Sequence, residues 1–139
     1  MLMELHVRTP GAGLLEITAQ VEDCLDKAGV VQGLVTLFVQ HTSCSILVQE
    51  NADPQVRRDL ETFFDRLVPP ADDPSMAWVR HADEGPDDMP AHIKAALTAV
   101  SLAIPIRDGR PALGQWQGIY LFEHRRRAHD RTIIVHIGA

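Results

Sequence analysis

The stretch GLVTLFVQHTSCSILVQENADPQVRRDL, residues 33–60, decides the fold because it encodes two strands and the start of a helix. Residues 33–40 and 45–49 are rich in apolar and β-branched side chains, which favour strands. The polar residues 41–44 (HTSC) separate these two runs, so we expect them at or near the junction of two core strands.

A helix follows with a clear beginning. Asp53 is a favourable N-cap, and Pro54 suits the first helical position because its fixed φ matches a helix. Apolar residues then recur at spacings of three and four until Pro69 ends the pattern. This stripe consists of Val56, Leu60, Phe63, Phe64 and Leu67.

The N-terminal segments predict two strands and another helix. Residues 2–8 alternate apolar and polar side chains, residues 14–17 form a short apolar run, and residues 18–28 have helical periodicity that stops at Gly29. The apolar face of this helix consists of Val21, Cys24, Leu25 and Ala28.

The C-terminal part predicts a third helix over about residues 90–99, followed by three strands. We expect Ile93, Ala96, Leu97 and Val100 to face inward. The strands are expected at residues 101–106, 117–123 and 132–137, with a turn at Asp108 and Gly109. This order predicts one α+β domain over residues 1–139, with mixed, largely antiparallel sheets and about three helices.

Composition limits the possible functions. The 139 residues carry a formal net charge of −6, which argues against a nucleic-acid surface. The short run Arg125–Arg127 is interpreted as a solvated turn, with a local contact to an anion as the minor alternative. No apolar segment is long enough to cross a membrane, and Met1–Met3 is followed by Glu4, so we expect a cytoplasmic protein without a signal peptide.

Four polar clusters have the residue types that build sites. His41 and its hydroxyl neighbours end an apolar strand, where a rigid scaffold presents side chains to a cleft. Cys44 in that cluster is interpreted as a buried thiol, with a nucleophile as the minor alternative. Glu50 and Asn51 form the second cluster, beside Asp53, whose main role is expected to be the helix cap.

The third cluster spans residues 80–92 and contains four acids and two histidines, His81 and His92. If these side chains converge, they form an imidazole–carboxylate metal site; otherwise the segment is a solvated acidic loop. The fourth cluster, residues 109–118, surrounds Trp116 with glycines. Trp116 is interpreted as a core or interface residue, with stacking on a ligand as the alternative. The remaining histidines, His6, His124, His129 and His136, are left out of the site.

Three segments together resemble the YjbQ family, whose members are described as secondary thiamine-phosphate synthases. The matching segments are HTSCSILVQENADPQVRRDL (residues 41–60), HADEGPDDMPAHIKAAL (residues 81–97) and SLAIPIRDGRPALGQWQGIYLFEH (residues 101–124). The resemblance implies an α+β homotrimer with a polar site near the subunit interface, whose ligands come from two chains.

The resemblance also implies roles for individual residues. His41, His81 and His92 are expected to bind a divalent metal, and three histidines favour zinc or another transition metal over magnesium. His41, Glu50 and Asp53 are expected to be catalytic, the two carboxylates by orienting metal-bound water. The expected substrate-binding residues are Thr42, Ser43, Asn51, Arg107, Trp116 and Gln117.

The implied reaction joins a pyrimidine pyrophosphate to a thiazole phosphate and releases pyrophosphate. Such a transfer needs a group that stabilises the departing pyrophosphate and a pocket that orients two rings. Two alternatives stay open. One is a non-catalytic trimer that binds a metal or a phosphorylated metabolite, and the other is a metal-dependent hydrolase of a small phosphorylated molecule.

Overall fold

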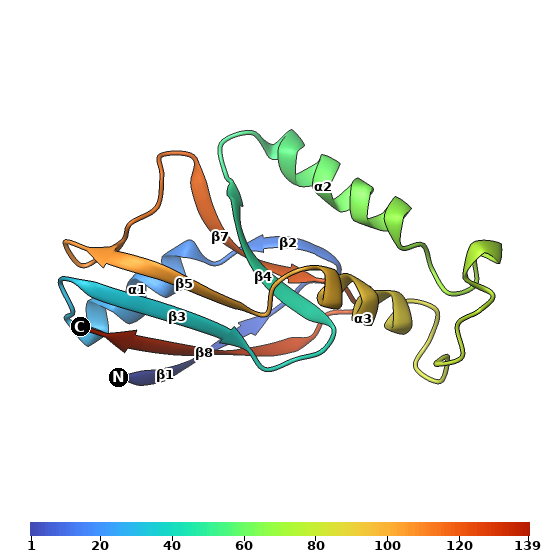
Figure 1. Cartoon of the computed structure of the whole chain (residues 1–139), viewed down its shortest axis with the longest axis horizontal. Helices are drawn as coiled ribbons and strands as arrows, with labels where there is room; N and C mark the ends of the chain where they lie inside the picture. The colour runs from blue at the N-terminus through green and yellow to red at the C-terminus, as the bar shows by residue number, and fades with distance from the viewer.

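The computed structural model describes residues 1–139, which form three α-helices, one 3-10 turn and eight strands (Figure 1). The helices are α1 (Thr18–Ala28), α2 (Pro54–Leu67) and α3 (Asp88–Leu97), and the 3-10 turn covers Pro74–Met76. The strands are β1 (Leu2–Arg8), β2 (Gly13–Glu16), β3 (Gly33–Val39), β4 (Cys44–Glu50), β5 (Ser101–Arg107), β6 (Arg110–Pro111), β7 (Gln117–Glu123) and β8 (Asp130–Gly138).

The strands form a five-stranded sheet in the order β1-β8-β3-β5-β6 and a three-stranded sheet in the order β2-β7-β4. Every pairing is antiparallel, from Leu2 opposite His136 in one sheet to Glu50 opposite Gln117 in the other. The predicted α+β class with antiparallel sheets and three helices is therefore confirmed. The β6 strand is too short for its pattern to be seen in the sequence.

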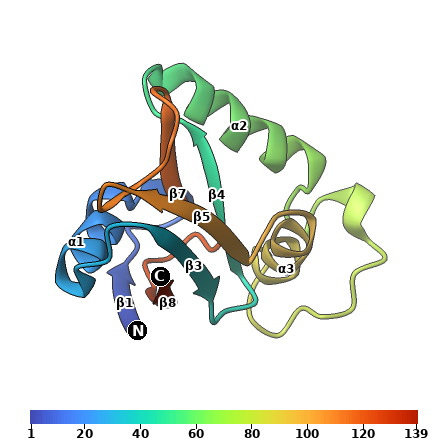
Figure 2. The same cartoon turned by 60° about the vertical axis from the view of Figure 1, so that its left-hand side comes forward.

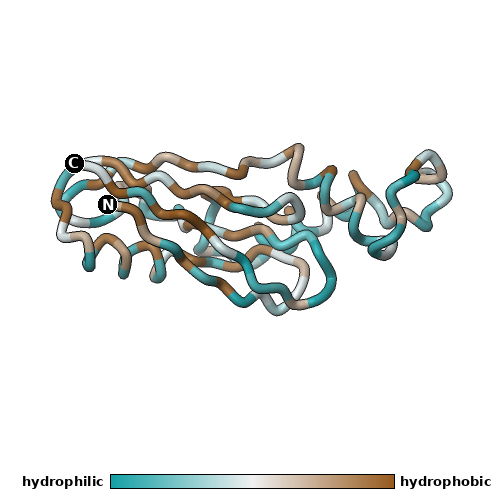
Figure 3. Tube along the Cα trace, turned by 90° about the horizontal axis from the view of Figure 1, so that it is seen from below, coloured by the Kyte–Doolittle hydropathy of each residue, from teal (hydrophilic) through white to brown (hydrophobic).

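The main core lies between the two sheets, with α1 closing one side (Figure 2). Burial alternates along β3 and β8, so every second residue of these strands points into the core. Figure 3 shows that apolar positions are concentrated along the strands of the molecule. Helix α1 contributes the buried side chains of Val21, Cys24 and Leu25, and it ends at Gly29, whose φ of 66° is left-handed. The predicted bounds of α1 are confirmed.

Helix α2 packs against the rest of the chain much more loosely than α1 does. It starts as predicted, with Asp53 accepting a hydrogen bond from the backbone N–H of Gln55. Leu60 and Phe64 cover a small second cluster on the outer face of the three-stranded sheet. None of its residues is buried, and Phe63 and Leu67 are more than half exposed, so its apolar stripe exceeds what this chain covers.

Helix α3 starts earlier than predicted and has a different phase. Its buried residues include Ala91, Lys94 and Ala95, whereas Ala96 and Leu97, which were predicted to face inward, are exposed. The reason is Asp88: the buried carboxylate at the first helical position sets the rotation of the helix. The spacing of apolar side chains cannot predict the buried face of a helix when a charged residue is part of that face.

Candidate metal site

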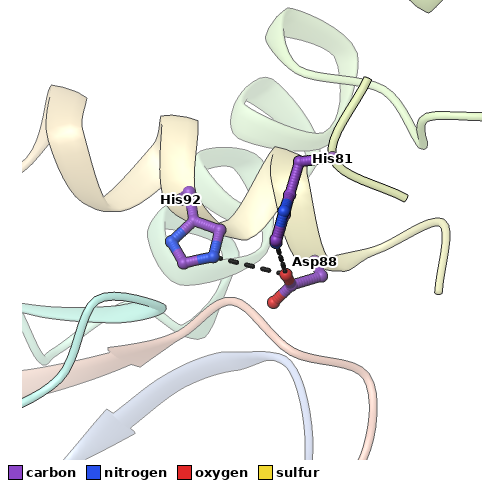
Figure 4. Close-up of side chains that lie close together, drawn as sticks. All are labelled: His81, Asp88 and His92. Atoms are coloured by element: carbon purple, nitrogen blue, oxygen red, sulfur yellow. Dashed lines mark hydrogen bonds and ion pairs between the residues drawn. The ribbon is translucent and has the colours of Figure 1, made fainter. Parts of the chain in front are cut away.

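The first residue of α3, Asp88, is a buried carboxylate on which two histidines converge (Figure 4). His81 comes from the preceding loop, and His92 lies one turn further along α3 on the same face. The Nε2 atoms of His81 and His92 lie 2.9 Å and 3.3 Å from Asp88 Oδ2. One ligand atom of each residue lies within 4.8 Å of the other two. Of the two alternatives for this segment, convergence is therefore observed for His81, His92 and one of the four acids, Asp88, which lies at the centre.

The second ring nitrogen of His92 fixes the chemistry of the first. His92 Nδ1 lies 3.0 Å from the backbone carbonyl oxygen of Thr42, and a carbonyl only accepts, so Nδ1 carries the hydrogen. In the neutral ring, Nε2 then presents a lone pair toward the carboxylate of Asp88. A lone pair facing a carboxylate repels it unless a proton or a cation lies between them. A ring nitrogen held by a backbone carbonyl is the usual outer contact of a metal-binding histidine.

The other carboxylate oxygen of Asp88 is held by Arg125. Arg125 is buried, and its Nη1 donates to Asp88 Oδ1 at 2.9 Å. Its Nε donates to Asp87 Oδ2 at 3.0 Å, and its Nη2 donates to the carbonyl oxygen of Glu84 at 3.0 Å. The interpretation of residues 125–127 as a solvated turn is therefore wrong for Arg125. This side chain turns inward because two carboxylates at the start of α3 pair with it.

Arg125 also supports the loop that carries His81. Burial raises the pKa of Asp87, but hydrogen bonds from the backbone N–H of Arg126 and from Arg125 outweigh it and hold that pKa below its usual value. Asp87 is consequently an anion bound to Arg125 at neutral pH. The pairing leaves Asp88 Oδ2 as the oxygen that faces the two imidazoles.

The donor set matches a transition metal. Two imidazole nitrogens and one carboxylate oxygen are the ligands of many catalytic zinc sites, which keep a further position open. Imidazole suits zinc, copper, iron and nickel, whereas magnesium is held mainly by oxygen atoms. The residues therefore fit the metal class that the sequence predicts, with Asp88 as the third donor.

His41 is not part of this group. Its Nε2 accepts a hydrogen bond from the backbone N–H of Thr132 at 2.8 Å, so that nitrogen is already used. Burial lowers the pKa of His41, and the charge of Arg131 lowers it further. Within one chain, the segment after β3 contributes the Thr42 carbonyl to the site, and metal binding by His41 stays a prediction.

The neighbours of His41 belong to the interior. Ser43 receives hydrogen bonds from Arg131 Nη2 on both its Oγ (3.0 Å) and its carbonyl oxygen (3.3 Å). Cys44 is fully buried, and burial raises the pKa of its thiol to about 12. The interpretation of Cys44 as a buried thiol is confirmed, because a thiol with this pKa is a poor nucleophile at neutral pH.

The remaining predicted residues gather at the opposite end of β4. Glu50 Oε2 accepts from the backbone N–H of Asp53 at 3.3 Å, and Asn51 Nδ2 donates to Glu16 Oε2 at 3.3 Å. Glu16 also accepts from the Thr18 hydroxyl at 2.8 Å. Glu16 was missed from the sequence because nothing in its own strand marks it as a partner of Asn51, 35 residues later.

The segment before β7 completes this second group. The backbone carbonyl of Trp116 accepts from the N–H of Asn51 at 2.9 Å, and Gln117 Oε1 accepts from the N–H of Gly114 at 2.8 Å. The Trp116 side chain is 58% exposed, so it is not a core residue of this chain. Trp78 is also exposed. Arg107 is exposed at the end of β5.

The two groups are far apart in one chain. Figure 1 shows β4 running from beside α3 to the start of α2. At about 3.3 Å per residue, its seven residues separate the Thr42 end from the Asn51 end by roughly 20 Å. One chain therefore brings together His81, Asp88, His92 and Thr42, but not Glu50, Asn51, Asp53, Trp116 or Gln117.

Comparison with known proteins identifies the family. The sequence profile described as UPF0047 protein YjbQ-like matches residues 3–139. The chain belongs to this family. A UPF0047 protein from Synechocystis is 49% identical over 133 residues, covering 96% of this chain and 88% of that protein. The UPF0047 protein YjbQ of Salmonella typhimurium is 45% identical over 119 residues, covering 85% of this chain and 83% of that protein.

Solved structures of YjbQ-like proteins have the same fold. A YjbQ/UPF0047 protein from Clostridium acetobutylicum superimposes with a TM-score of 0.85 at 35% identity, covering 98% of this chain and 99% of that chain. A protein from Thermus thermophilus gives a TM-score of 0.84 at 39% identity, with the same coverage. No helix of the chain is both long enough and apolar enough to span a membrane.

Proposed function

We propose that this YjbQ-like chain binds a divalent transition metal, such as zinc, through His81 Nε2, Asp88 Oδ2 and His92 Nε2. The observation that carries the proposal is the convergence of these three atoms within 4.8 Å around a buried carboxylate. The outer contacts support it, because His92 is oriented by the Thr42 carbonyl and Asp88 by Arg125.

The proposed activity is a transfer reaction on phosphorylated small molecules, of the thiamine-phosphate synthase type. A pyrimidine pyrophosphate is joined to a thiazole phosphate, and pyrophosphate leaves. A metal with an open position supplies a Lewis acid for oxygens of the departing pyrophosphate. The chain's own residues would hold that metal in place, and Arg125 orients the Asp88 carboxylate through its hydrogen bond to Oδ1.

The reaction also needs groups that bind the two rings, and these are proposed to come from a second copy of the chain. Glu50, Asn51, Trp116 and Gln117 lie at the far end of β4, so they reach a metal site only in a neighbouring subunit. The homotrimer expected from the family resemblance provides such a neighbour. Its formation is supported by apolar side chains that one chain leaves exposed, which include Phe63, Leu67, Trp78 and Leu97.

Metal analysis of purified protein tests the site. We expect one equivalent of metal in the wild type and loss of it in His81→Ala, Asp88→Asn and His92→Ala. His136→Ala is the matched control, because His136 is an exposed histidine on β8. His41→Ala distinguishes this ligand set from the three histidines predicted from the sequence. Retained metal in this variant would support Asp88, and not His41, as the third ligand. Full metal content in His92→Ala would contradict the proposal.

Product analysis tests the activity and separates the alternatives. A transferase releases pyrophosphate only when both thiamine precursors are present. A metal-dependent hydrolase consumes one phosphorylated compound with water alone, and a binding protein shows affinity without turnover. Either of the last two outcomes with the metal site intact would overturn the transferase proposal but leave the metal proposal standing.

A further inference from the structure

A cavity of about 240 Å³ lies on the other side of α3 from the candidate metal site, between α3 and α2. Its polar lining consists of Asp65, Asp87, Lys94, His124 and Arg126. A smaller cavity of about 70 Å³ adjoins it and shares Asp65, Lys94 and His124. Asp87 and Lys94 face this side of α3, whereas Asp88 and His92 share the metal side, because 3.6 residues make one helical turn.

Lys94 is the main cation of this cavity, and most of its hydrogen-bond donors have no protein acceptor. The residue is 9% exposed, yet its ammonium makes a single hydrogen bond, to Asp65 Oδ1 at 2.7 Å. An ammonium has three N–H donors, so two of them lack a protein acceptor. Asp65 itself is 73% exposed on α2, so its carboxylate can turn into solvent at little cost. A buried ammonium with spare donors favours an anionic ligand.

Two further groups in the lining have unused hydrogen-bonding capacity. His124 is 4% exposed; its Nε2 pairs with Ser45 Oγ at 2.9 Å, and its Nδ1 has no partner. Arg126 donates its backbone N–H to Asp87, but its guanidinium forms no ion pair. The guanidinium is exposed at the rim and is free to pair with a ligand that enters the cavity.

The acidic groups nearby are mostly committed to other partners. Asp87 is bound by Arg125 and by the backbone of Arg126. In the smaller cavity, Glu123 pairs with Arg131, and Glu61 accepts from the backbone N–H of Leu14. Asp65 is therefore the one carboxylate that competes with a ligand for Lys94.

We propose that this cavity is a second ligand site, distinct from the metal site, which binds the phosphate group of a small metabolite between Lys94 and Arg126. Two cationic groups match a phosphate dianion better than a carboxylate monoanion. Their charge-assisted hydrogen bonds are among the strongest that a side chain makes. Asp65 holds Lys94 in place while the site is empty and swings out when phosphate enters.

Calorimetric titration with inorganic phosphate at constant ionic strength tests the proposal, with a chelator present throughout. The chelator removes metal, so the result is independent of the metal site. We expect the wild type to bind phosphate and to bind acetate at least about tenfold more weakly. Lys94→Met is expected to weaken phosphate binding by at least about tenfold, since a hydrogen bond to a charged group is lost.

Variants at the rim keep the test sharp if Lys94→Met fails to fold. Arg126→Gln changes an exposed side chain and is expected to weaken phosphate binding severalfold, whereas the adjacent exposed Arg127→Gln, which does not line the cavity, leaves it unchanged. Asp65→Asn removes the competing carboxylate and is expected to tighten binding. The proposal is overturned if the wild type does not bind phosphate, if Arg126→Gln and Arg127→Gln behave alike, or if Asp65→Asn weakens binding.

Discussion

The two ends of β4 differ in how their polar residues are held. At the Cys44 end, charged side chains are buried in pairs: Arg131 with Glu123, and Arg125 with Asp88. At the Glu50 end, Asn51 is exposed and makes one long side-chain hydrogen bond, to Glu16. We call the Cys44 end the closed end, because its charged side chains are paired within one chain. We call the Glu50 end the open end, because it presents an exposed polar surface.

This difference separates two kinds of functional residue. A buried pair costs several kcal/mol to desolvate and is stable only when its partners and hydrogen bonds are all present. Such an end is suited to fixing the position of Asp88, the carboxylate of the proposed metal site. The exposed polar groups of the open end cost little desolvation free energy, and a bound partner can change their geometry. The expected effects of substitutions therefore decrease from the closed end to the open end.

The largest effect is expected for Glu123→Ala. Glu123 accepts from the Thr9 hydroxyl at 2.7 Å and from Arg131 Nε at 2.8 Å, so its loss leaves Arg131 as an uncompensated buried charge. We expect the free energy of unfolding to fall by about 3–5 kcal/mol, measured by urea denaturation. The control is Asp130→Ala, which breaks the exposed pair with Arg8 and is expected to cost less than about 1 kcal/mol. Equal losses would show that the closed end is not special.

The second effect concerns metal affinity at the same end. Arg125→Lys keeps the positive charge but cannot bind Asp87, Asp88 and the Glu84 carbonyl together, because an ammonium lacks the planar fork. We expect the zinc Kd, measured by competition with a chromogenic chelator, to rise by about 10- to 100-fold. Arg127→Lys is the matched control. An unchanged Kd in Arg125→Lys would mean that Asp88 needs no support.

The contrast between the ends also explains what the sequence predicted well. The strands around residues 33–50 and the start of α2 follow from apolar periodicity and from Asp53 and Pro54, which act locally. His81 and His92 were singled out because imidazoles among acids are conspicuous, and the family resemblance then assigned them to a metal. Asp88 stood in the same acidic run, and its spacing of four from His92 is the local signal that could have selected it.

The remaining features depend on partners distant in sequence. Arg125 is buried because Asp87 and Asp88, 38 and 37 residues away, face it, and a run of arginines contains no sign of that. The separation of the predicted site into two groups follows from the direction of β4, which residue patterns do not give. Surfaces such as Phe63 and Trp116 look like core in the sequence because an apolar side chain has the same signature in either place.

Acid is expected to weaken the closed end through His124 in particular. Burial, followed by the charge of Lys94, lowers the pKa of His124 to about 3, so the folded chain keeps it neutral while the unfolded chain protonates it below about pH 6.5. The unfolded state then binds more protons, so stability falls as the pH falls. Between pH 6.5 and pH 5 the loss is about 2 kcal/mol. The lowered pKa of His41 acts in the same direction.

Urea denaturation across this pH range, with chelator present, checks the assignment. His124→Asn is expected to have a shallower pH dependence than the wild type between pH 6.5 and pH 5, whatever its stability at pH 7. The control is His136→Asn at an exposed position of β8, for which we expect the wild-type slope. The lowered pKa of Glu123 adds a further loss only below about pH 4.5, so it does not disturb this window. An unchanged slope in His124→Asn would show that His124 is not responsible for the loss of stability in acid.

The smallest effect on stability is expected at the open end, for Trp116→Ala. Trp116 is 58% exposed. Its contribution to the fold is the backbone carbonyl that accepts a hydrogen bond from the N–H of Asn51, and truncation of the side chain leaves this bond in place. We expect the free energy of unfolding of dissociated chains to change by less than about 0.5 kcal/mol. If the open end completes a neighbour's metal site, the same variant raises the KM for the phosphorylated substrate while metal content stays at the wild-type level. A large loss of stability without a change in KM would instead make Trp116 a packing residue, and the open end would then have no role in substrate binding.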